Sequence, residues 1–185
     1  MTVILSIDDI FSLYASKGNE AYGERVTSLE HSLQCAHLAR KDGADDELVI
    51  ASLLHDIGHL VADVQGDERF DMEVDDDDHE AVGARLLSPL FGPKVSQPVS
   101  LHVTAKRWRC TVEPSYHDGL SDTSKATLKA QGGLMSEEEC RRFEQHPGFQ
   151  RALDLRSWDD QAKEMEVDCP PLESYRTLML RLLRS

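Results

Sequence analysis

The sequence lacks a long apolar run, clustered cysteines and the signature of a secreted protein. No stretch among its 185 residues approaches the roughly 20 consecutive apolar residues of a membrane-spanning helix. The N-terminus does not show the basic-then-apolar layout of a signal peptide. The four cysteines are scattered without a C-x-x-C pair, which is typical of reduced thiols and not of a disulfide framework. These absences predict a cytoplasmic protein without membrane contact.

Positive charge is also scarce, because 34 acidic residues face 20 basic ones and give a formal net charge of -14. Such a chain repels phosphate backbones, which argues against nucleic acid as a partner. The same field favours a small substrate that itself carries positive charge. The length suits one compact domain over residues 1–185.

Helical periodicity dominates what is present, and no run alternates in the manner of a strand. Ser136 and Glu139 form a capping-box pattern. Periodicity and end signals together predict helices over 6–18, 28–43, 45–58, 79–90, 95–108, 149–163 and 172–183. The sequence therefore predicts an all-α fold, a single helical bundle.

The chemistry lies in the histidines and in two aspartates. Imidazole nitrogens and carboxylate oxygens together suit divalent first-row metals, whereas structural zinc favours clustered cysteine. Adjacent His and Asp point in different directions on a helical turn, so one carboxylate can bridge two ions. The candidates for a two-metal site in the bundle core are His31, His55, Asp56, His79, His102 and Asp159.

Each of these residues has a simpler alternative. An isolated His-Asp pair is usually a surface pair or a cap, and Asp159 could be a helix charge paired with Lys163 at i+4. The remaining histidines, His37, His117 and His146, are interpreted as ordinary helix residues. The prediction depends on the ordered set and not on any member alone.

The ordered set resembles the HD-domain superfamily. More narrowly, the chain is similar to the mixed-valent di-iron oxygenases of the PhnZ and TmpB type, over about residues 24–163. The segments that carry the similarity are LEHSLQCAHLA, HDIGH, DHEAVGA, HVTAKRW, LSDTSKATLKAQGG and WDDQAK. Ordinary HD phosphohydrolases share the H…HD…D pattern but do not require the segments that contain AKR and TLKAQGG.

The resemblance implies two iron ions in an Fe(II)/Fe(III) state, with dioxygen as co-substrate. One iron would be held by His31, His55, Asp56 and Asp159. The other would be held by Asp56, as a bridge, with His79 and His102. The implied reaction is oxidative cleavage of a carbon–phosphorus bond to give a carboxylic acid and phosphate.

The resemblance also implies substrate contacts. His59 and Lys106 would act at the substrate and offset the phosphonate charge, and Lys106 is an i,i+4 neighbour of His102 on the same helix. Ser124 and Gln131 would bind the phosphonate. Without the resemblance, Lys106 would be an exposed helix lysine, Ser124 a helix-start serine and Gln131 a polar surface residue.

One departure concerns the lid over the substrate amine. The family pairs a glutamate seven residues before the first histidine ligand, here Glu24, with a tyrosine three residues earlier, where this chain has Ala21. Tyr22 lies one residue away and is the candidate for that role; the alternative of equal weight is that Tyr22 is an ordinary, partly buried loop aromatic. Aromatic faces from Tyr22 and Trp108 beside Glu24 would suit a trimethylammonium group.

The favoured organophosphonate substrate is therefore (R)-1-hydroxy-2-(trimethylamino)ethylphosphonate, giving glycine betaine and phosphate. The alternative is (R)-2-amino-1-hydroxyethylphosphonate, giving glycine and phosphate. Two further classes stay open: a metal-dependent phosphohydrolase, in which the same ions activate water, and a non-catalytic HD module, which should have lost some ligands.

Overall fold

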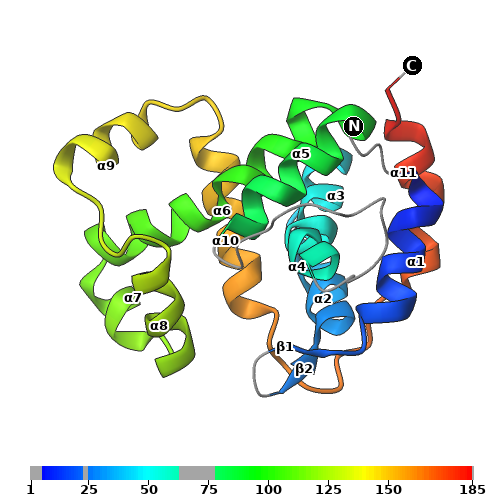
Figure 1. Cartoon of the computed structure of the whole chain (residues 1–185), viewed down its shortest axis with the longest axis horizontal. Coiled ribbons are helices and arrows are strands. Elements are labelled where there is room, and N and C mark those ends of the chain that lie inside the picture. Colours follow the sequence, from blue (N-terminus) through cyan, green and yellow to red (C-terminus); the bar gives the residue numbers. More distant parts are fainter. Residues whose placement is uncertain (1–5, 23–24, 63–77, 185) are drawn as a thin grey trace.

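The computed structural model describes residues 6–22, 25–62 and 78–184, which form an almost entirely helical bundle (Figure 1). This confirms the all-α prediction. The helices are α1 (Ile7–Lys17), α2 (Ser28–Lys41), α3 (Asp46–Leu54), α4 (Ile57–Ala62), α5 (His79–Phe91), α6 (Pro93–Val112), α7 (Pro114–Gly119), α8 (Asp122–Ala130), α9 (Glu137–Glu144), α10 (Phe149–Gln161) and α11 (Arg176–Leu182), with a 3-10 turn η3 over Leu172–Tyr175. Two antiparallel strands of two residues each, β1 (Ala21–Tyr22) and β2 (Val26–Thr27), precede α2. None of the described helices is both long and apolar enough to cross a bilayer.

Helix starts follow the end signals in the sequence. Thr27 caps α2 and pairs reciprocally with Glu30, and the predicted capping box of Ser136 and Glu139 at α9 is confirmed. The helix expected over 95–108 extends from Pro93 to Val112. Its start at Pro93 is possible because proline fits the first turn, where its missing N–H is not needed.

The segment expected as one helix over 45–58 is broken after Leu54. The chain turns at His55 and Asp56 before α4 begins at Ile57. Gly58 then lies against the backbone of His79, and a β-carbon added at Gly58 would fall 2.0 Å from the His79 carbonyl oxygen. The break and this close approach bring His55, Asp56 and His79 together.

Two apolar clusters support the bundle. The larger one contains the buried faces of α1, α3, α4, α5 and α11. The hydroxyl of the fully buried Tyr14 donates to the Leu53 carbonyl at 2.8 Å and lies 3.0 Å from Ser32 Oγ. The smaller one joins the C-terminal half of α6 to α9 and α10 through Ala105, Phe143 and Ala152. Figure 1 shows α7, α8 and α9 beyond α6, on the side opposite α1 and α11. The candidate site lies between the helices of the central group, α2 to α6 and α10.

Candidate functional site

Six side chains from five different parts of the bundle meet in its interior. His31 comes from α2, His55 and Asp56 from the turn after α3, and the other three from α5, α6 and α10. All six are less than a tenth exposed: His31, His55, Asp56, His79, His102 and Asp159. These are the six predicted metal ligands.

The first half of the site is formed by His31 and His55, whose Nε2 atoms lie 3.3 Å apart. Asp159 Oδ1 lies 3.3 Å from His31 Nε2, and Asp56 Oδ2 lies 3.3 Å from His55 Nε2. The outer Nδ1 atoms donate to the carbonyls of Ala162 and Ser52 at 2.8 and 2.9 Å. Each Nδ1 therefore carries a proton, so in the neutral imidazole, the form that binds a metal, the Nε2 lone pair is directed inward.

The second half repeats this arrangement with His79 and His102. Their Nε2 atoms lie 3.2 Å apart, and Asp56 Oδ1 lies 3.5 Å from each. His102 Nδ1 donates to the Val99 carbonyl at 2.7 Å, and Glu80 Oε2 lies 3.5 Å from His79 Nδ1. The two oxygens of Asp56 thus face different histidine pairs.

Unpartnered buried atoms show that this donor set fits cations. Asp56 Oδ2 and Asp159 Oδ1 are buried and have no hydrogen-bond partner in the described part of the chain. Leaving a buried carboxylate oxygen unpaired is costly, and a coordinated ion would remove that cost. With four imidazole nitrogens converging on the same carboxylates, the set suits two divalent first-row ions bridged by Asp56.

The protonation states in this cluster have identifiable causes. Burial disfavours the charged form of His55, but the Asp56 carboxylate beside it dominates and raises the pKa of His55 to about 9. His102 is governed by burial, which lowers its pKa to about 4. Burial also opposes ionisation of Asp56, yet the surrounding imidazoles hold its pKa well below the usual range. The centre therefore holds ionised carboxylate, which attracts cations.

Asp159 is oriented by an arginine that sequence analysis missed. Arg156 Nη1 lies 2.7 Å from Asp159 Oδ2, and the same guanidinium binds Asp160. Lys163, the partner considered from i+4 spacing, lies beyond the end of α10. The i,i+3 spacing of Arg156 and Asp159 was the available signal, and this pairing leaves Asp159 Oδ1 for the ion site.

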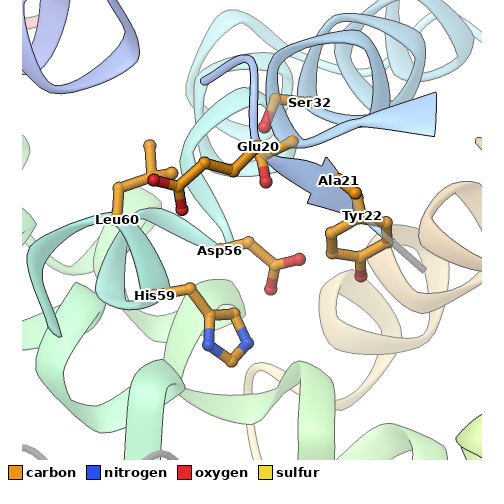
Figure 2. Close-up of a pocket in the computed structure, with 8 residues that line it drawn as sticks. Glu20, Ala21, Tyr22, Ser32, Asp56, His59 and Leu60 are labelled. Atoms are coloured by element: carbon orange, nitrogen blue, oxygen red, sulfur yellow. The ribbon is translucent and has the colours of Figure 1, made fainter. Parts of the chain in front are cut away.

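A cavity of about 230 Å³ opens beside Asp56 (Figure 2). Figure 2 shows the Asp56 carboxylate between the rings of His59 and Tyr22. Tyr22 stacks on His31 with ring centroids 3.9 Å apart, and His59 stacks on His79 at 3.8 Å. The residues that line the cavity are Glu20, Ala21, Tyr22, Ser28, Ser32, Asp56, His59 and Leu60.

Tyr22 therefore reaches the cavity although the resemblance placed a tyrosine at position 21. Burial, and then the charges of Asp56 and Asp159, raise the pKa of the Tyr22 phenol well above its usual value, so the group stays protonated. Glu24, the other residue of the expected lid, lies outside the described residues.

Lys106 is buried and not an exposed helix lysine. Its ammonium donates to Thr127 Oγ1 at 2.7 Å and to Gln131 Oε1 at 3.1 Å. Burial, and then the nearby Arg156, lower the pKa of Lys106 to about 8. Thr127 was missed by sequence analysis, although it lies in α8 between the two phosphonate-binding candidates Ser124 and Gln131.

Not all the substrate-contact candidates lie together. Ser124 is half-buried and takes part in the N-cap of α8, where its Oγ accepts from Ser121 Oγ. Lys106, Ser124 and Gln131 are absent from the cavity lining. Trp108 packs edge-to-face on Phe149 and donates to Glu144, so it lends the cavity no aromatic face.

Comparison with known proteins agrees with this geometry. The HD-domain family model matches residues 28–141. The hydroxymethylphosphonate dioxygenase of Gimesia maris is 44% identical over 171 residues, covering 92% of this chain and 85% of the relative. The [1-hydroxy-2-(trimethylamino)ethyl]phosphonate dioxygenase (glycine-betaine-forming) of Leisingera caerulea is 34% identical, covering 96% and 90%. An uncharacterised protein of Acanthamoeba polyphaga mimivirus is 36% identical, covering 98% and 83%.

Proposed function

This chain belongs to the HD-domain family and, within it, to the oxygenases of the PhnZ and TmpB type, and we propose that it uses dioxygen to cleave the carbon–phosphorus bond of a small 1-hydroxyphosphonate. The observation that carries the proposal is Asp56, whose two carboxylate oxygens face two separate histidine pairs while the residue also lines the cavity. A substrate in that cavity would lie directly beside both ions.

We propose that the ions are iron. The first would be held by His31, His55, Asp56 and Asp159, and the second by Asp56, His79 and His102. Imidazole and carboxylate ligands suit iron, and bound iron supplies the redox chemistry that oxidation by dioxygen requires. The protein's own part is to fix these ligands through their outer hydrogen bonds, such as those to Ala162 and Ser52.

The substrate we propose first is hydroxymethylphosphonate. A trimethylammonium group needs aromatic faces, and in the described cavity lining one face of Tyr22 is already stacked on His31 while Trp108 lies elsewhere. The relative with 44% identity carries the name of that substrate. The products would be formate and phosphate, with a proton released; the oxygen atoms of substrate and dioxygen balance those of the products.

The trimethylammonium substrate favoured from the sequence is the second candidate. Glu20 lines the cavity and brings a carboxylate, and the relative with 34% identity carries that substrate in its name. However, Lys17 Nζ lies 2.9 Å from Glu20 Oε1 and offsets its charge. A substrate without a cationic group is therefore favoured over either amine.

A side-by-side assay tests this proposal. Phosphate release by iron-loaded protein is measured in air on hydroxymethylphosphonate, the trimethylammonium compound and the primary-amine compound. We expect the highest kcat/KM on hydroxymethylphosphonate, with formate as co-product. A higher kcat/KM on the trimethylammonium compound would reverse the order of substrates, and no release from any of the three would contradict the proposed reaction.

Lys106 does not line the cavity, but it lies one helical turn after the proposed ligand His102 on α6, and it provides a prediction for phosphonate binding beside the ions. Replacing it with methionine should raise KM about 10- to 100-fold, because a charge-assisted hydrogen bond contributes about 1.5–3 kcal/mol. In the wild type, kcat/KM should fall above about pH 8, as the ammonium with a pKa of about 8 loses its proton. The variant should lack that alkaline step.

The matched control is Lys129→Met, an exposed lysine on α8. This variant should keep both the wild-type KM and the alkaline step. An unchanged KM in Lys106→Met would remove Lys106 from the phosphonate site.

A further inference from the structure

Cys35 offers a third kind of donor, a thiol, beside the imidazoles and carboxylates of the first metal position. It lies one helical turn after His31 on α2, so both side chains point to the same face of that helix. Its thiol is fully buried, and Sγ lies 3.7 Å from His31 Nε2. The ligand atoms of His31, Cys35 and His55 all lie within 4.8 Å of one another.

These distances match donors that share one tetrahedral ion. With metal–nitrogen bonds of about 2.0–2.1 Å and a metal–sulfur bond of about 2.3 Å, a tetrahedral angle places the ligating nitrogen and sulfur roughly 3.6 Å apart. The observed separations are 3.7 Å from Cys35 Sγ to His31 Nε2 and 3.3 Å between the two imidazole Nε2 atoms. Asp159 Oδ1, buried and unpartnered among the described residues, lies 3.3 Å from His31 Nε2 and supplies the fourth donor.

We propose that His31, Cys35, His55 and Asp159 form a tetrahedral site that takes a thiophilic divalent ion, such as Zn²⁺, in place of iron. The inference rests on the first metal position of the proposed function, but not on the reaction carried out there. On binding, the sulfur–hydrogen bond of Cys35 breaks, the thiolate coordinates the ion, and the proton leaves to solvent. Because zinc has no redox chemistry, an ion held this way blocks the oxygenase reaction.

Cobalt(II) tests the site, because it adopts zinc-like geometry and its thiolate complexes absorb in the near ultraviolet by charge transfer. The apoprotein is titrated with Co²⁺ without oxygen. We expect the charge-transfer band in the wild type and its loss in Cys35→Ser and Cys35→Ala, while visible cobalt absorption persists. Proton release per ion should fall in both variants.

The matched control is Cys140→Ala, which changes another buried cysteine, located in the smaller apolar cluster. It should keep the band. Zn²⁺ affinity, measured by competition with a chelator, should fall at least about tenfold in the Cys35 variants, the lower limit for disturbing even an outer-shell partner, and should be unchanged in Cys140→Ala.

The outcomes separate this inference from the oxygenase proposal. Visible cobalt absorption without a charge-transfer band in the wild type, or a band that survives in Cys35→Ser, would overturn the role of Cys35 and leave the reaction untouched. No cobalt binding by the folded wild type would overturn both the thiol site and the metal centre. The oxygenase proposal is tested separately, by oxygen-dependent phosphate release from iron-loaded protein, and neither cobalt result replaces that measurement.

Discussion

Replacing Asp56 with asparagine is expected to lower the rate of phosphate release by at least about 100-fold, the upper end of what losing even an outer-shell partner costs a metal site. The carboxylate faces all four histidines, with its Oδ1 3.5 Å from His79 and His102 and its Oδ2 3.3 Å from His55. An amide has the same shape but carries no charge to bridge two cations. Iron content and phosphate release, measured on the same preparations, check the prediction.

Thermal unfolding distinguishes loss of metal from loss of fold. An ion that binds only the folded state raises Tm, so the wild type should gain stability on metal addition and Asp56→Asn should lose most of that gain. The control is Asp154→Asn, a carboxylate on α10 that accepts from Gln150, and it should behave as the wild type. Full metal content and activity in Asp56→Asn would contradict the bridging role.

Adding one methyl group at Gly58 should damage the second half of the site from a distance. A β-carbon there would lie 2.0 Å from the carbonyl oxygen, 2.7 Å from the carbonyl carbon and 2.9 Å from the α-carbon of His79. Because these are backbone atoms, α4 and α5 must separate and His79 must move away from Asp56. We expect Gly58→Ala to lose about 1–3 kcal/mol or more of unfolding free energy, to bind less iron and to lose most of its activity.

Gly83→Ala is the matched control. It adds the same methyl group to a glycine on the other side of the α4–α5 interface, in α5. Its β-carbon would meet ordinary van der Waals contacts, with Ile57 and Val99 side-chain atoms at 3.4 Å and the Gly58 backbone nitrogen at 3.5 Å. Stability near the wild-type value is expected, because alanine is the better helix former. Wild-type iron content in a folded Gly58→Ala protein would show that the close approach does not position His79.

The sequence predicted the helices and the residue types of the site better than their surroundings. Lys106 follows His102 by four residues, about 40° around the helix, and so lies on nearly the same face. Trp108 follows His102 by six residues, about 240° around the helix, and packs against the smaller apolar cluster instead. Side-chain type suggested Trp108 for a cation site, whereas helical geometry argues against it.

The contacts that were missed depend on three-dimensional packing. Arg156 and Cys35 carried only an i,i+3 or i,i+4 spacing to a ligand, which most surface pairs on helices share. Tyr22, Asp56 and His59 were site candidates and line the cavity. The rest of the lining was not predicted, because it depends on how β1 packs against α2 and α4. In the proposed function the substrate preference depends on these few lining residues and not on Trp108, which lies outside the lining.

The most direct test of the central claim compares dioxygen consumed with phosphate released, in a closed cell, by iron-loaded protein acting on hydroxymethylphosphonate. The proposed reaction predicts equal amounts of the two, formate as co-product, and no phosphate under strict anaerobiosis. Phosphate release at the same rate without oxygen would contradict it and identify the metal centre as that of a hydrolase.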